Sequence, residues 1–127
     1  MLIMFILCCA YIFDKQGGHG YARKITYEDI TLEDAKNPVI IIQNYTDDQF
    51  ANAVKVSDIT FSNFRGTSAD ECAVKLLCDK DIGCTNIVLD QINITSSLPE
   101  KKTSASCFNA HGKSSSSNIP HVSCLSI

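Results

Sequence analysis

Three stretches of the chain alternate apolar and polar residues in the same way. Each stretch is centred on an isoleucine, and these anchors, Ile30, Ile59 and Ile92, stand 29 and 33 residues apart. Alternation with a period of two is typical of a β-strand that buries one face. The pattern therefore predicts a series of strands that recur at a nearly regular interval.

Two continuous apolar runs, residues 39–42 and 74–77, lie between these stretches and predict buried strands. Turn-forming residues such as Asn37-Pro38 separate the strands. A helix over residues 71–79 is an alternative, but this stretch is short and has no helical pattern on either side. A repeat of short strands predicts an all-β solenoid whose stacked coils share one core, and a small β-sandwich is the alternative.

The tail from Ser96 onward has a different composition. Residues 101–106 and 114–118 are polar and rich in serine, and only residues 107–108 and 122–125 have an ordered character. The last coil of a solenoid needs a cover over its open strand edges. We expect a polar tail, tied down by a disulfide, to provide that cap.

Composition limits the class of protein. The 127 residues are 45% hydrophobic and 20% charged, which suits one domain and not two. A net charge of −3 without a run of Lys or Arg disfavours a nucleic-acid partner. No C-x-x-C pair occurs, and no histidine stands at zinc-ligand spacing from a cysteine pair. We expect no metal site and no cofactor.

Cysteines and glycosylation sequons indicate an oxidising compartment. Five of the seven cysteines lie in the second half of the chain, and sequons begin at Asn44 and Asn93. Two sequons beside several cysteines favour the secretory route. We expect a secreted, extracellular protein.

Residues 1–15 form an apolar leader in front of a single unit, residues 16–127. The apolar run of residues 2–13 is shorter than the ~20 residues of a membrane-spanning helix, so we expect no membrane span. Its length suits the core of a signal peptide, with Cys8 and Ala10 as small residues before a cleavage point. No Lys or Arg precedes the run, and the alternative is an aberrant start of a shortened chain.

Four longer motifs lie in different parts of the chain. They read Q-G-G-H-G-Y-A-R-K-I from Gln16, N-P-V-I-I-I-Q-N-Y from Asn37, F-R-G-T-S-A from Phe64 and S-C-F-N-A from Ser106. All four resemble stretches of plant-type polygalacturonases, glycoside hydrolase family 28. The resemblance implies a right-handed parallel β-helix of the cell wall that hydrolyses α-1,4-linked galacturonic acid in pectin. The resemblance also implies that the chain binds pectin or oligogalacturonate, and that it is a monomer or an aggregation-prone fragment.

The family's catalytic motifs are not found in their family setting in this sequence. Family members resemble one another in N-T-D, G-x-D-D, G-H-G and R-I-K stretches, of which the first three belong to coils before Gln16. The R-I-K position reads Tyr11-Ile12-Phe13, which offers no cation for a substrate carboxylate. Hydrolysis needs one carboxylic acid to protonate the leaving oxygen and one carboxylate to activate water. The resemblance therefore implies a truncated polygalacturonase that is inactive by itself. The alternatives are a non-catalytic secreted module that binds pectin or a protein and, ranked last, a pectate lyase.

Two short matches to these motifs do not indicate catalytic residues. His19 stands in a G-H-G triplet, but its flanks match the Q-G-G-x-G-Y stretch, in which this position varies. Asp47-Asp48 lacks the glycine and cysteine flanks of the family motif and is expected in a solvated turn. We therefore predict no catalytic residue in this chain.

Tyr45 is the functional residue that the resemblance transfers to this chain. It matches the tyrosine of the family's Q-x-Y stretch, which lies at the rim of the cleft and contacts sugar. A phenol offers a flat apolar face and a hydroxyl group for this contact. The alternative is a tyrosine packed at a strand end. Ile42 stands where relatives often have Asp, and Thr46 where many have a further cysteine.

The resemblance also pairs four of the cysteines. It implies one disulfide between Cys78 and Cys84, around a short loop, and another between Cys107 and Cys124, in the tail. Each loop closure should stabilise the fold by ~2–4 kcal/mol. Cys72 remains single, and we expect a buried small hydrophobe and not a reactive nucleophile.

Overall fold

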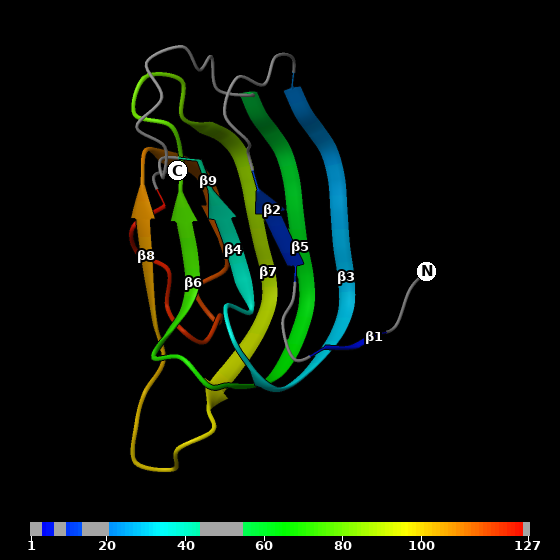
Figure 1. Cartoon of the computed structure of the whole chain (residues 1–127), viewed down its shortest axis with the longest axis vertical. Helices are drawn as coiled ribbons and strands as arrows, with labels where there is room; N and C mark the ends of the chain where they lie inside the picture. The colour runs from blue at the N-terminus through cyan, green and yellow to red at the C-terminus, as the bar shows by residue number, and fades with distance from the viewer. Residues whose placement is uncertain (1–3, 7–9, 14–20, 44–54, 126–127) are drawn as a thin grey trace.

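Parallel strands make up the regular structure of the chain. The computed structural model describes residues 4–6, 10–13, 21–43 and 55–125, which contain nine strands. The strands are β1 (Met4–Ile6), β2 (Ala10–Phe13), β3 (Tyr21–Ala35), β4 (Val39–Ile42), β5 (Lys55–Ser68), β6 (Cys72–Leu77), β7 (Cys84–Ser96), β8 (Ser104–Phe108) and β9 (Ala110–Ser114). Figure 1 shows the long strands β3, β5 and β7 side by side, with β4, β6 and β8 in a second row.

Successive strands alternate between two sheets. Sheet A has the order β1-β3-β5-β7-β9, and sheet B has the order β2-β4-β6-β8. Every neighbouring pair in both sheets is parallel. Such a path winds the chain into stacked coils, each contributing one strand to each sheet. The expected all-β solenoid, a parallel β-helix, is confirmed over the small β-sandwich.

Apolar side chains of successive coils line up in ladders inside the solenoid. In sheet A the strand registers align three such rows, Ile25–Ile59–Ile87, Tyr27–Phe61–Leu89 and Ile30–Phe64–Ile92. The core between the sheets also takes in Val74 and Leu76 of β6. Burial raises the pKa of the Tyr27 phenol above its ordinary value of 10.0, and its ring stacks on Phe61 with centroids 5.4 Å apart.

The long strands of sheet A bend wherever a residue takes a positive φ angle. These residues recur every five positions, at Lys24, Asp29 and Asp34 in β3, at Asp58 and Asn63 in β5, and at Asn86 and Gln91 in β7. Most are Asn or Asp, which tolerate the left-handed region better than other side chains with a β-carbon. The bends stack between coils, because Asn63 Nδ2 donates to Asp29 Oδ1 at 2.7 Å. Each long strand therefore follows the curved wall of the coil.

The predicted alignment of Ile30 with Ile59 is wrong. Ile59 pairs with Ile25, five residues earlier in β3, whereas Ile30 pairs with Phe64. Because the bends recur within a strand, the D-I-T triplets at Ile30 and Ile59 look alike although they belong to different ladders. The coils are 34 and 28 residues long, in place of the expected 29 and 33.

The G-T-S-A motif turns the chain from sheet A toward sheet B. Gly66 takes a φ angle of 137°, which a residue with a side chain rarely adopts. Thr67 Oγ1 accepts a hydrogen bond from the Asp34 amide at 2.8 Å. The buried Ser68 hydroxyl donates to the Asp70 carbonyl at 2.7 Å. The motif therefore has a structural role at this corner.

The remaining strand predictions have mixed outcomes. The apolar runs 39–42 and 74–77 are confirmed as β4 and part of β6, and the helix considered for residues 71–79 is wrong. The tail contains more regular structure than expected, because β8 and β9 both form in it. Within the leader, β1 pairs with β3 and β2 with β4. None of the described residues belongs to a helix with the length and hydropathy to cross a membrane.

Candidate functional site

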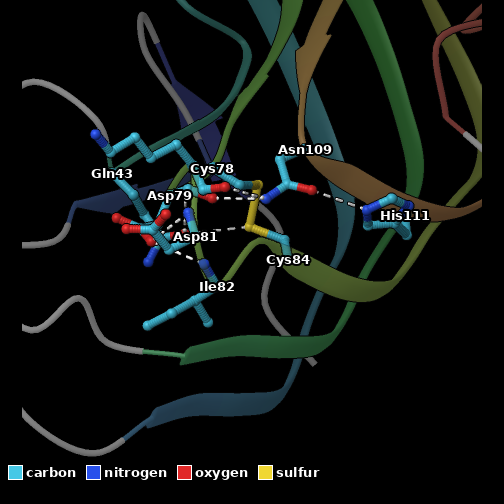
Figure 2. The surroundings of a disulfide bond; sticks show 9 residues. Gln43, Cys78, Asp79, Asp81, Ile82, Cys84, Asn109 and His111 are labelled. Carbon is cyan, nitrogen blue, oxygen red and sulfur yellow. Dashed lines mark hydrogen bonds between the residues drawn. A yellow bond between two sulfur atoms is a disulfide. The ribbon is translucent and has the colours of Figure 1, made fainter.

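The strands of sheet B end side by side, and the segments that follow them form a polar rim. Gln43 follows β4, the loop from Cys78 to Cys84 follows β6, and Asn109 follows β8 (Figure 2). The parallel registers of the sheet bring these segments together from three successive coils. We call this group the sheet B rim.

Gln43 is fixed at the centre of the rim. Gln43 is only 3% exposed, and its backbone amide donates a hydrogen bond to the Leu77 carbonyl at 2.8 Å. Its Oε1 accepts a hydrogen bond from the Asp79 amide at 3.2 Å. Cys84 Sγ lies 3.3 Å from the same oxygen, a packing contact because a disulfide sulfur carries no proton. Sequence reasoning missed Gln43, although it belongs to the Q-x-Y motif.

The loop over the rim is closed by a disulfide between Cys78 and Cys84. The Asp79 carboxylate accepts hydrogen bonds from the amides of Asp81 and Ile82, at 2.9 and 2.8 Å. An aspartate that satisfies the backbone of its own turn in this way is a structural residue. The carboxylate is therefore held by two backbone donors of its own loop.

Asn109 ties the next coil to this loop. It takes a positive φ of 53°, and its Nδ2 donates to the carbonyls of Asp79 and Lys80, at 2.8 and 3.2 Å. Its Oδ1 lies 3.0 Å from His111 Nε2. The S-C-F-N-A motif therefore places one asparagine between two coils, a role that the motif signalled but sequence reasoning did not assign.

The structure forms the two disulfides that the family resemblance implied. Besides the rim disulfide, Cys107 of β8 is bonded to Cys124, which ties the tail to sheet B. Cys72 is free and only partly buried, contrary to the expectation of a buried hydrophobe. Its Sγ lies 3.2 Å from the Ser106 hydroxyl and 3.4 Å from the Val74 carbonyl, because it stands at the start of β6 and outside the core cluster.

The other residues singled out from the sequence are distributed as follows. Tyr45, Asn44, His19 and the Asp47-Asp48 pair lie outside the described residues. Asn93 is exposed on β7. In the described part of the chain, no group of three His, Cys, Asp or Glu side chains is arranged to hold a metal ion.

Comparison with known proteins agrees with this architecture. The sequence profile of Glycosyl hydrolases family 28 matches residues 12–119. A probable polygalacturonase of Arabidopsis thaliana is 39% identical over 121 residues, covering 88% of this chain and 26% of that protein. A polygalacturonase of Juniperus ashei is 38% identical, covering 88% and 22%, and polygalacturonase-2 of Solanum lycopersicum is 35% identical, covering 88% and 25%.

The chain spans about a quarter of the length of these relatives. The match extends across both sheets of the solenoid, from β2 through β9, and includes all the segments of the sheet B rim. Parallel strands in both sheets and positive-φ bends at Asn and Asp form one consistent pattern over the described residues. The chain belongs to glycoside hydrolase family 28.

Proposed function

We propose that this chain forms the part of a pectin-degrading polygalacturonase that binds galacturonan at the sheet B rim, without hydrolysing it alone. Membership of the family supports the substrate class. The observation that carries the proposal is the fixed position of Gln43, since Tyr45 follows it by two residues in the chain. The phenol of a tyrosine is a suitable platform for a sugar ring.

The chemistry of glycoside hydrolysis supports the second half of the proposal. The reaction requires an acid and a base or nucleophile on opposite sides of the scissile bond. The Asp79 carboxylate, which lies at the rim, already accepts two backbone hydrogen bonds. The 127 residues do not contain the family's N-T-D or G-x-D-D stretches, so a catalytic carboxylate pair is missing from this sequence.

A binding and turnover experiment tests the proposal on one sample. We expect the full chain to bind oligogalacturonate saturably and to release no reducing sugar from polygalacturonic acid. Tyr45→Ala should weaken binding about tenfold or more, because it removes the ring that stacks on the sugar. Tyr45→Phe should retain most of the affinity. Turnover by the purified chain, or equal binding by Tyr45→Ala, would contradict the proposal.

We place the protein in the secretory route and outside the cell, at the cell wall. Asn93 and Thr95 of its sequon are both exposed on β7, which leaves the asparagine accessible to a glycan. Intact mass of protein from a secreting plant cell line, before and after deglycosylation, should decrease by at least one glycan. Asn93→Gln should remove that glycan, and Asn44→Gln reports on the second sequon. Full retention of the unmodified mass in the secreted protein would argue against both sites.

The monomeric state and the absence of a nucleic-acid partner remain predictions from composition and family resemblance. The mild net charge of −3 supports the second of them. A filter-binding assay with DNA and RNA at low salt, together with sizing chromatography, tests these two expectations.

A further inference from the structure

A hollow lies at the end of sheet B opposite to the rim. It sits between the loop that connects β7 to β8, at the lower end of Figure 1, and the tail after β9. Thr103 lines it and precedes β8, whereas Asn109 of the rim follows that strand. Its volume is about 390 Å³. That volume is within the range of pockets that take a small ligand. We call it the tail pocket.

The tail forms a rigid wall of this pocket. The Ile119 amide donates to the Ile92 carbonyl at 2.8 Å, and the Ile94 amide donates to the Ile119 carbonyl at 2.7 Å. The buried Asn118 side chain accepts from the Ile92 amide at 3.0 Å and donates to the Leu89 carbonyl at 2.9 Å. The tail therefore docks on β7 like an added strand.

The facing wall is the β7–β8 loop, which is also held by hydrogen bonds. The Thr103 hydroxyl donates to the Ile94 carbonyl at 2.8 Å. The Lys101 amide donates to the Leu98 carbonyl at 3.0 Å, and the Leu98 amide donates to the Ser96 hydroxyl at 3.0 Å. With both walls fixed, the pocket is formed before any ligand arrives, which lowers the entropy cost of binding.

The chemistry of the lining favours an anionic ligand with an apolar face. Lys101, Lys102 and His121 line the pocket, and no acidic residue does. In the described part of the chain, these three side chains make no hydrogen bond or ion pair, so their donors are available. Ile119, 46% exposed, and Pro120 supply an apolar floor. A pyranose ring can lie on such a floor through its C–H face while an attached carboxylate meets an ammonium group.

A neighbouring hollow limits the length of the ligand. It has a volume of about 250 Å³, shares Ser96 and Lys101 with the tail pocket, and is lined by Asp70 and Glu71. Carboxylates there would repel a polyanion that continued in this direction. The tail pocket therefore suits a terminal or short acidic sugar and not the middle of a long chain running past Asp70.

From these features we propose that the tail pocket is a second saccharide site, which binds a terminal uronic-acid unit through Lys101 and Lys102. The preference for an acidic sugar follows from the pocket itself, and the choice of galacturonate as that sugar rests on the proposed function. The site is separate from the sheet B rim, because the two lie at opposite ends of β8. A chain with both sites holds a pectin fragment at two places.

The test titrates the full chain with digalacturonate and follows backbone amide signals by NMR. We expect shifts at Thr95, Thr103 and Ile119. The double variant Lys101→Gln/Lys102→Gln should weaken the affinity at these amides about tenfold or more, because two charge-assisted contacts are lost. The matched control Lys36→Gln/Lys113→Gln makes the same charge change at exposed lysines outside the pocket and should leave the affinity unchanged.

Three outcomes would overturn the proposal. The first is equal affinity in the two double variants, and the second is equal binding of neutral maltotriose. The third is binding of inorganic phosphate as tight as that of digalacturonate, which would reduce the pocket to an unspecific anion site. Tyr45→Ala separates the two saccharide sites, since it should leave the tail-pocket amides unaffected. If only the proposed function fails, the amide signals of the sheet B rim will not shift with digalacturonate. The amide signals of the tail pocket will still shift with glucuronate.

Discussion

Replacing Gly66 with alanine is expected to prevent stable folding of the solenoid. A β-carbon at this position would lie 1.9 Å from the Leu32 carbonyl oxygen and 2.7 Å from the Leu32 carbonyl carbon. Backbone atoms of the adjacent coil cannot move aside without breaking the β3–β5 ladder, in which Leu32 and Gly66 are partners. The φ angle of 137° adds strain for any residue with a side chain. We expect a loss of more than about 4 kcal/mol in the free energy of unfolding.

Urea denaturation followed by far-ultraviolet circular dichroism measures this loss. Arg65→Ala is the matched control, because Arg65 is exposed on the same strand and should change the free energy by less than about 0.5 kcal/mol. Gly112→Ala should behave like Gly66→Ala, since its β-carbon would lie 1.8 Å from the Ile87 carbonyl oxygen. A native-like unfolding midpoint for Gly66→Ala would show that the close approach of the two coils is not needed.

Replacing Phe61 with alanine is expected to remove about 3–5 kcal/mol from the free energy of unfolding. Phe61 is fully buried, stacks on Tyr27 and meets Phe64 edge to face with centroids 5.8 Å apart. Removing the ring leaves a cavity between the side chains of the two adjacent coils. The hydrogen-bonded strands hold these coils in place, so the cavity cannot close fully.

The same substitution, phenylalanine to alanine, at an exposed position provides the control. Phe108 is 46% exposed at the end of β8, so Phe108→Ala should cost about 1 kcal/mol or less. Phe61→Leu should fall between the two, because it keeps most of the apolar volume. A loss for Phe61→Ala no greater than that for Phe108→Ala would contradict the assignment of Phe61 to the solenoid core.

The type of fold was predictable from the sequence because its signals are local. Alternation around the anchor isoleucines predicts strands, and the apolar runs that became β4 and β6 predict buried strands. Turn residues at the corners and a repeat of short strands point to a solenoid. The family motifs added the disulfide pairs, which the structure also forms.

The register between coils was not predictable in the same way. Bends every five residues give β3 and β5 an internal repeat, so D-I-T at Ile59 resembles D-I-T at Ile30 more closely than it resembles its true partner, K-I-T at Ile25. The sequence pattern alone cannot distinguish pairing of Ile59 with Ile30 from pairing with Ile25. The structure decides for Ile25, because that register stacks Asn63 on Asp29 and brings Gly66 against Leu32.

The two proposed binding regions differ in how much of each was foreseeable. Family resemblance marked Tyr45, but the roles of Gln43 and Asn109 became visible only when three coils were placed side by side. The tail pocket had no signal, since Lys101 and His121 are far apart in a serine-rich tail with little apolar patterning.

The sequence by itself determined that this protein is an all-β solenoid of stacked coils, together with its turns. These features depend on residue types at short spacing, which act through local backbone preference and burial. The disulfide pairs and the absence of the catalytic stretches from these 127 residues followed from the family resemblance. Only the tertiary structure decided the coil lengths, the rim around Gln43 and the pocket beside Lys101. These depend on contacts between residues about one coil apart, whose partners are chosen by packing and hydrogen bonds across the sheets.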